Sequence, residues 1–447
     1  MGPWKAAQLF LEEIDFLDLN QLEVHLYGSL AKTGKGHGTD IAVQLGLMGY
    51  DPKTIPVEEI DTAIEDIKVN QALFVGERIR IPFNPNEHIV FHFDKTLEAH
   101  PNALTLKAIH QSGKLVEQTY YSVGGGFITT DDTQESETRV DIKFPVQWGE
   151  ELLKWCEQED VSIHELLWIN EQAWRPKEEI YLKLDEIWET MKQCVFRGCN
   201  RKGILPGGLN VKRRAFEMNS QLSEGKVFDH VDDWVDYIKS RQVGFSETLK
   251  WVSCFALAVN EENASFGRVV TAPTNGASGV IPAVLMYYAL FSEEASQEGI
   301  RNFIMTAGEV GSIFKKGSTI SAAMGGCQAE IGVSSAMAAA GLTECLGGNP
   351  QQALMAAEIA MEHHLGMTCD PIGGLVQIPC IERNTMGAIK AITACQIALN
   401  SDPKSALVSL DDVIKSMWET AVDMNTKYKE TSEGGLASQI SVIVPEC

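Results

Sequence analysis

The spacing of apolar residues changes near residue 145, and this change constrains the fold more than any other feature of the sequence. Before it, apolar and polar residues alternate in the segments 22–27, 103–109 and 118–123, as they do in half-buried strands. The third segment runs into three consecutive glycines, which indicate a turn, and residues 39–48 have the pattern of a short amphipathic helix. We therefore predict a sandwich-like α/β domain over residues 1–141.

Helical periodicity dominates after Pro145. It predicts helices at residues 147–157, 182–197, 227–240, 334–346, 351–364 and 385–399. Helices rich in Ala and Gly approach one another closely, so we predict a compact all-α domain over residues 142–447. A chain of 447 residues is also too long for one ordinary core, and the predicted fold class is α+β with two domains.

Composition excludes several kinds of partner. The net charge is −24, and a surface of that sign is repelled by a phosphate backbone, so we expect no nucleic-acid partner. No apolar run reaches the length of about 18 residues that a membrane span requires, and the N-terminal residues lack the apolar core of a signal peptide. We expect a cytoplasmic protein with no membrane partner, whose ten cysteines stay reduced.

Three cysteines lie where a helix begins or a loop bends. Cys327 follows two glycines, Cys369 follows a predicted helix, and Cys380 precedes another. Unpaired backbone N–H groups at a helix start favour a thiolate, and three converging thiolates suit a soft metal or an iron–sulfur cluster. The intervals between positions 327, 369 and 380 are 42 and 11 residues, which match no compact metal-binding motif. On spacing alone, three small buried side chains remain an open alternative.

Seven segments of the chain are similar to motifs of one family. The loop Val270-Thr271-Ala272-Pro273-Thr274-Asn275-Gly276-Ala277 resembles a signature loop of the bacterial one-chain iron–sulfur L-serine dehydratases, or L-serine ammonia-lyases. Residues 33–40, 121–127, 326–328, 365–371, 376–384 and 427–437 resemble further motifs of these enzymes, in the expected order. The resemblance spans nearly the whole chain.

The resemblance implies an activity and a cofactor. Members of this family convert L-serine to pyruvate and ammonia without pyridoxal phosphate, in serine degradation and gluconeogenesis. Their helical catalytic domain holds a 4Fe–4S cluster on three cysteines, which correspond here to Cys327, Cys369 and Cys380. In some members a C-terminal cysteine caps the fourth iron until substrate displaces it, and Cys447 corresponds to that residue. The family's serine-rich segment with a histidine precedes the Gly-Pro that is Gly2-Pro3 here, and this chain begins after that segment.

Further roles follow from the same correspondence. His37 is the expected base for the α-proton of serine, because its ordinary pKa lies near neutrality and it lies in a Gly-rich loop. Lys35 is the rival base. The substrate is expected to contact the loop residues Thr271, Thr274, Asn275 and Gly276, which offer hydroxyl, amide and backbone N–H groups. Arg383 either pairs with the substrate carboxylate or forms a structural ion pair.

Other functions stay open on the sequence alone. A pyridoxal-phosphate dehydratase catalyses the same net reaction, but no lysine lies in the setting expected for a Schiff base. A regulatory protein that binds an amino acid would not need the cysteines, and the N-terminal domain alone fits that description, as an effector-binding or dimerisation domain. Threonine also stays open as a substrate, because one methyl group changes binding by only about 1–3 kcal/mol. A homodimer is the expected assembly for an enzyme of this size.

Overall fold

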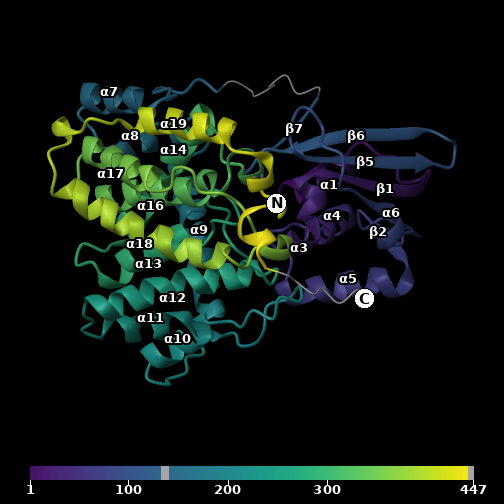
Figure 1. Cartoon of the computed structure of the whole chain (residues 1–447), viewed down its shortest axis with the longest axis horizontal. Helices are drawn as coiled ribbons and strands as arrows, with labels where there is room; N and C mark the ends of the chain where they lie inside the picture. Colours follow the sequence, from purple (N-terminus) through teal and green to yellow (C-terminus); the bar gives the residue numbers. More distant parts are fainter. Residues whose placement is uncertain (132–139, 441–447) are drawn as a thin grey trace.

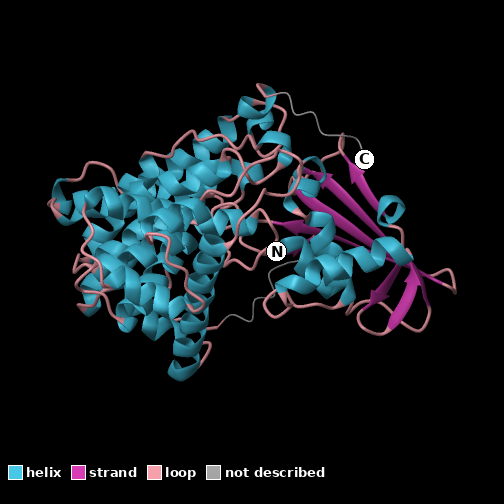
Figure 2. Cartoon of the chain, turned by 90° about the horizontal axis from the view of Figure 1, so that it is seen from below, coloured by secondary structure: helices cyan, strands magenta, loops and turns pink. Residues whose placement is uncertain are grey.

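The structure, a computed structural model, describes residues 1–131 and 140–440. Its N-terminal part carries the main sheet, and its C-terminal part is built from helices (Figures 1 and 2), which confirms the predicted α+β class. Strand β7 (Ile128–Thr130) ends the sheet, and helix α7 (Gly149–Glu159) begins the helical part. The predicted domain boundary at residues 141 and 142 falls between these two elements. Each part has its own large hydrophobic core.

The N-terminal sheet has five strands in the order β4-β1-β5-β6-β7. Its four longer strands are β1 (Leu19–Gly28), β4 (Ile89–His92), β5 (Asn102–His110) and β6 (Leu115–Ser122). Strand β1 pairs in parallel with β4 and antiparallel with β5, and β5 and β6 form an antiparallel hairpin. The three strands predicted from alternation are confirmed as β1, β5 and β6, with ends that differ by one to three residues.

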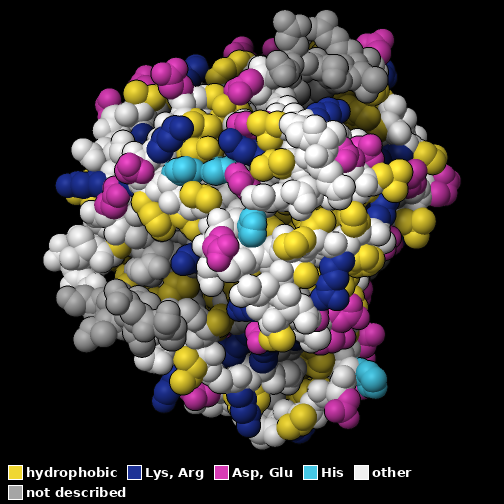
Figure 3. Space-filling view, turned by 90° about the vertical axis from the view of Figure 1, so that its right-hand side faces the viewer, with side chains coloured by type: hydrophobic (Ala, Val, Ile, Leu, Met, Phe, Trp, Pro, Cys, Tyr) yellow, Lys and Arg dark blue, Asp and Glu magenta, His cyan; other side chains and the backbone are white. Residues whose placement is uncertain are grey.

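Helices cover one face of this sheet (Figure 2). Alternate residues of β1, namely Leu22, Val24 and Leu26, are buried in one core with residues of α1 (Gly2–Phe10) and α4 (Thr39–Met48). The helix predicted at residues 39–48 is confirmed as α4. The remaining elements of this part are α2 (Ser29–Lys32), α3 (Gly34–His37), α5 (Val57–Asn70), β2 (Ala72–Val75), β3 (Ile79–Pro82) and α6 (Pro85–His88). Acidic and basic side chains are interspersed over the face of the molecule seen in Figure 3.

The helical part confirms all six predicted helices as α7, α9, α11, α16, α17 and α18. Helix α18 begins at Cys380 rather than at residue 385, because the N–H group of Ile381 already bonds to the carbonyl oxygen of Gln377. Among the described residues, no helix is both long enough and apolar enough to cross a membrane. The helices after α7 are α8 (Ile163–Glu171), α9 (Lys177–Asn200), α10 (Ala215–Leu222), α11 (Val231–Lys239), α12 (Phe245–Asn263), α13 (Val280–Phe291), α14 (Gln297–Gly317), α15 (Ala322–Gly325), α16 (Ile331–Cys345), α17 (Pro350–Glu362), α18 (Cys380–Leu399) and α19 (Leu410–Asp423).

Helix α16 forms the centre of this part and packs against α13, α14, α17 and α18 (Figure 1). Its small residues allow this close packing. A Cβ atom added to Gly341, for example, would lie 2.9 Å from the carbonyl oxygen of Phe303 in α14. Thirteen of its fifteen residues are buried, and this helix leads out of the segment that carries Cys327.

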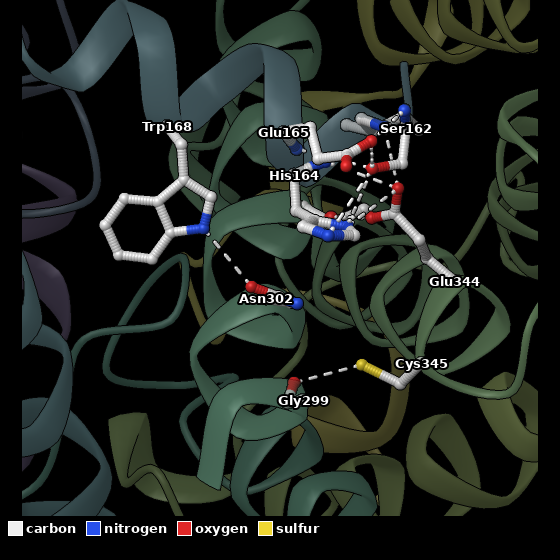
Figure 4. A network of polar contacts seen from close by, with 10 residues as sticks. Ser162, His164, Glu165, Trp168, Gly299, Asn302, Glu344 and Cys345 are labelled. Atoms are coloured by element: carbon white, nitrogen blue, oxygen red, sulfur yellow. Dashed lines mark hydrogen bonds and ion pairs between the residues drawn. The ribbon is translucent and has the colours of Figure 1, made fainter. Parts of the chain in front are cut away.

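A buried carboxylate at the far end of α16 links it to α8 (Figure 4). Glu344 accepts a hydrogen bond from the backbone N–H of Ile163 at 2.7 Å and lies 3.2 Å from Nδ1 of His164. Burial lowers the pKa of His164, but the hydrogen bond and the charge of Glu344 outweigh it and raise the pKa above its usual value. Together these contacts satisfy N–H groups at the start of α8. They also anchor the C-terminal end of α16, whose N-terminal end follows the segment that carries Cys327.

Candidate active site

A cavity of about 280 Å³ lies between the N-terminal part and the helical part. The N-terminal part contributes Thr33 and His37 to its wall, and the helical part contributes Cys369, Cys380 and the loop that includes Asn275. Residues far apart in the sequence therefore share one enclosed space. A junction between domains is a usual place for a small-molecule site.

The three predicted cysteine ligands come from three different segments. Cys327 begins a short 3-10 helix, Cys380 is the first residue of α18, and Cys369 forms an isolated parallel bridge with Lys429. All three thiols are free and buried. The sulfur atoms of Cys327 and Cys369 and a carboxylate oxygen of Glu330 all lie within 4.8 Å of one another, and Cys380 lines the same cavity as Cys369.

The chemistry of these thiols fits a soft metal centre. Contact with the Cys327 thiol, followed by burial, raises the pKa of Cys369 well above its usual value, and burial raises the pKa of Cys380 in the same direction. Such thiols become thiolates when a metal cation neutralises them. Three thiols from separate segments, buried and not joined in disulfides, are donors suited to an iron–sulfur cluster.

Arg383 lies beside this cysteine group. Its guanidinium donates to the sulfur of Cys327 at 3.4 Å, to the carbonyl oxygen of Thr368 at 2.6 Å and to the carboxylate of Asp370 at 2.8 Å. Of the two roles expected for Arg383, these contacts favour the structural ion pair, because the side chain already has an acidic partner. Its positive charge also faces the cysteine sulfur.

The loop of residues 270–277, which resembles a signature loop of the family, lines the cavity. Thr271, Thr274, Asn275 and Gly276 are all part of its wall. The hydroxyl group of Thr271 donates to the side-chain oxygen of Asn275 at 3.0 Å. Asn384 in α18 holds the loop from behind, since it donates to the carbonyl oxygen of Gly276 at 2.7 Å and accepts from the N–H of Gly279 at 3.0 Å. The loop is therefore fixed to the helix that begins with Cys380.

His37 enters the cavity from the N-terminal part. Its Nδ1 atom lies 3.5 Å from a carboxylate oxygen of Glu430, and its buried Nε2 atom has no hydrogen-bond partner among the described residues. Burial lowers the pKa of His37 to about 4, so the ring is neutral at physiological pH. A neutral imidazole that keeps its Nε2 lone pair free has the form required of a general base.

Close backbone contacts hold the His37 loop against the helical part. A Cβ atom added to Gly36 would lie 2.2 Å from the carbonyl oxygen of Gly374, and one added to Gly38 would meet the ring of Phe266. Gly38 also has a φ of +64°, which favours glycine. These positions admit no side chain, so the loop approaches the other domain as closely as a backbone allows.

Lys35 lies outside the cavity wall, and Cys447 is not among the described residues. Lys35 extends over the ring of Phe91, with its Nζ atom 5.3 Å from the ring centroid, and it is not part of the cavity wall. His37 therefore has the better position of the two predicted bases. Cys447 lies outside the described residues, so its predicted role as a cap stays a prediction.

Three residues of this site were not predicted from the sequence: Glu330, Glu430 and Asn384. Glu330 and Glu430 line the cavity, and Asn384 supports its loop. Glu430 and Asn384 lie within segments that resemble family motifs, so the motifs pointed to their neighbourhood without giving their roles. Glu330 follows Cys327 by three residues, and a carboxylate so close to a cysteine ligand was the available signal.

These features define a class: an enzyme whose candidate active site lies at a domain junction, where cysteines suited to a metal share a cavity with a neutral histidine. Comparison with known families is specific. Residues 1–133 match the family model described as "Serine dehydratase beta chain", and residues 158–437 match the one described as "Serine dehydratase alpha chain". The chain belongs to the L-serine dehydratase family.

Curated relatives extend over nearly the full length of the chain. The L-serine dehydratase of Streptomyces coelicolor is 46% identical over 98% of this chain and 95% of the relative. L-serine dehydratase 1 of Escherichia coli is 43% identical, and the L-serine dehydratase of Helicobacter pylori is 41% identical, each with the same coverage. The family expected from the motifs is thereby confirmed.

Proposed function

We propose that this protein is an L-serine ammonia-lyase that converts L-serine to pyruvate and ammonia with a 4Fe–4S cluster held by Cys327, Cys369 and Cys380. The single observation that carries the proposal is the cavity in which Cys369, Cys380 and a neutral His37 meet. Family membership supports the substrate, and the buried free thiols support the cluster. In this proposal residues 142–447 hold the cluster and residues 1–141 supply the base.

When bound, the cluster supplies a Lewis acid that weakens the C–O bond of the substrate hydroxyl group. The protein supplies the remaining functions. The loop that contains Thr271, Asn275 and Gly276 orients the amino acid through its hydroxyl, amide and backbone N–H groups. Arg383 places a positive charge against the sulfur of Cys327 and so helps to hold the ligand thiolates.

His37 removes the α-proton at Nε2. Glu430 faces Nδ1 on the opposite side of the ring, and in its ionised form it favours the tautomer that carries its proton on Nδ1. The lone pair of Nε2 then faces the cavity. Loss of the proton and of the hydroxyl group leaves aminoacrylate, which tautomerises to an imine, and water hydrolyses the imine to pyruvate and ammonia.

We further propose a cytoplasmic homodimer that acts in serine degradation and supplies pyruvate for gluconeogenesis. The family and the free thiols support a metabolic role in a reducing compartment. Light scattering coupled to size-exclusion chromatography measures the mass directly, and a monomeric mass would contradict the dimer.

Anaerobic purification, with iron and sulfide counted per chain, tests the function. The wild type is expected to bind a cluster and to form pyruvate from L-serine. Replacing Cys327, Cys369 or Cys380 singly by Ser is expected to remove most of the iron and abolish turnover, because two thiolates rarely retain a cubane. Cys156→Ser is the matched control, since Cys156 is an equally buried free thiol in α7, remote in sequence from the site.

Two results would contradict the proposal. The first is full iron content in a Cys369→Ser variant. The second is an iron-free wild type whose absorbance is reduced by borohydride, because that identifies a pyridoxal-phosphate enzyme.

A further inference from the structure

Glu330 is a half-buried acid with no basic partner among the described residues. The hydroxyl group of Thr274 donates to its Oε1 atom at 2.5 Å, and no ion pair to Glu330 forms within the part of the chain that the structure describes. Its Oε2 atom faces Gly276, where an added Cβ atom would lie 3.0 Å away. The carboxylate is thus held in place by the substrate loop and lies on the cavity wall. A carboxylate in this position can pair with a positive charge that a ligand supplies.

An amino acid brings such a charge. When an ammonium group is buried, it needs a carboxylate or equivalent acceptors, because an unpaired buried charge is strongly unfavourable. The cavity wall contains two acids, Glu330 and Glu430. Glu430 already faces His37 and accepts a hydrogen bond from Asn102, whereas the one hydrogen-bond donor to the Glu330 carboxylate within residues 1–131 and 140–440 is the hydroxyl group of Thr274.

We propose that Glu330 binds the α-ammonium group of the substrate and makes the site specific for amino acids over hydroxy acids. This inference rests on the proposed function and assigns one residue a role within it. The distances agree with the shape of serine. Its ammonium and hydroxyl groups are on adjacent carbons, and the Glu330 carboxylate lies within 4.8 Å of the sulfur atoms of Cys327 and Cys369.

The inference also makes Thr274 a positioning residue. Its hydroxyl group occupies one oxygen of the carboxylate and leaves the other for the ligand. Thr274→Val keeps the size of the side chain and removes the hydroxyl group, so it is expected to weaken amino-acid binding less than the loss of the Glu330 charge.

The test measures binding without turnover. L-alanine keeps the ammonium and carboxylate groups but has no hydroxyl group to lose, and propanoate lacks the ammonium group as well. Calorimetric titration of the anaerobic holoenzyme is expected to give tighter binding of L-alanine than of propanoate. In Glu330→Gln this preference should fall by about 30-fold. The affinity for propanoate should change by less than about twofold, because propanoate has no ammonium group to lose a partner.

Kinetics and iron content complete the test. Glu330→Gln should raise the KM for L-serine by about 30-fold while the inhibition constant of 3-hydroxypropanoate, which is serine without its ammonium group, stays nearly constant. Iron per chain should equal that of the wild type.

Two further variants support the test. Glu330→Asp, which keeps the charge, should retain part of the preference for L-alanine, and it replaces Glu330→Gln in the test if that variant does not fold. Glu358→Gln is the matched control, because Glu358 is a buried acid in α17 that does not line the cavity.

Three outcomes would overturn the assignment. The first is that Glu330→Gln weakens the binding of L-alanine and of propanoate equally. The second is loss of iron from this variant, because that would make Glu330 a ligand of the metal. The third is a wild type that does not bind L-alanine more tightly than propanoate. The proposed function fails separately, if the wild type binds iron and L-alanine but forms no pyruvate from L-serine.

Discussion

At the scale of single residues, burial sets the chemistry of His37. An exposed histidine is partly protonated near neutrality, but His37 is half-buried, and desolvation lowers its pKa to about 4. The protonated form cannot accept the α-proton, so activity should be lost only as the pH falls through about 4. An exposed base with a pKa near 6.5 would lose about nine-tenths of its active form at pH 5.5. We therefore expect kcat, measured at saturating L-serine, to stay nearly level between pH 7 and pH 5.5, and a fall centred near pH 6.5 would contradict this.

Removal of the imidazole separates catalysis from cluster binding. His37→Ala is expected to lower kcat by about 10²–10⁴-fold, the usual contribution of a general base. Iron content should stay at the wild-type level, because the three cysteines belong to the other domain. The measurements are initial rates of pyruvate formation and iron per chain. Near-normal kcat in this variant would exclude His37 as the base.

The resemblance of their segments to family motifs selected His37 and the three cysteines, which residue type and spacing alone did not single out. The resemblance did not select Glu330 or Glu430. A glutamate is common on any surface, and its sequence neighbours do not reveal that it lines a cavity. Only the folded structure shows that both acids lie on the cavity wall.

At the scale of elements, replacing a helical glycine by alanine can lower or raise the free energy of unfolding, depending on what the glycine faces. Gly198 in α9 lies against α12, and an added Cβ atom would be 2.4 Å from the carbonyl oxygen of Ala258. Gly308 in α14 faces open space. Gly198→Ala should lower the free energy of unfolding by about 1–3 kcal/mol through overpacking. Gly308→Ala should raise it by up to about 1 kcal/mol through better helix propensity.

Chemical denaturation of the two variants under identical anaerobic conditions measures both changes. If both substitutions stabilised the protein equally, this result would contradict the close contact between α9 and α12 at Gly198.

Periodicity predicted the helices that have one polar face and overlooked some that do not. Helix α13 has ten buried residues out of twelve, so it shows no alternation between an apolar and a polar side. Such a segment resembles a buried strand as much as a helix, and its neighbours in space decide between the two. The strands β1, β5 and β6 were predictable because only one face of their sheet is covered by helices.

At the scale of the whole molecule, activity depends on how the two domains meet. Gly36 contacts the carbonyl oxygen of Gly374, so Gly36→Ala should displace the His37 loop from the cysteine site. A displacement of about 1 Å lowers kcat by about 100-fold. Iron content and the circular dichroism spectrum should be unchanged. Gly244→Ala is the matched control, because a Cβ atom at Gly244 meets nothing within 4 Å. Full activity in Gly36→Ala would show that the contact does not position the loop.

The contact between Gly36 and Gly374 could not be predicted from the sequence. Residues 36 and 374 are separated by more than 300 positions, and both are glycines without a chemical signature. Gly36 lies in the segment 33–40, which resembles a family motif, whereas Gly374 falls between two other such segments. The two glycines come together only when the two domains pack against each other.

The two separate cores have a consequence for the order of events during synthesis. Every strand pairing of the five-stranded sheet lies within residues 19–130. The ribosome releases this part first, and domains generally fold as units while the rest of the chain is still being made. The thiols at positions 327, 369 and 380 emerge last, so they meet a histidine loop that has already folded. Loading of the proposed cluster is then expected to be a late step of maturation, completed on a nearly finished protein.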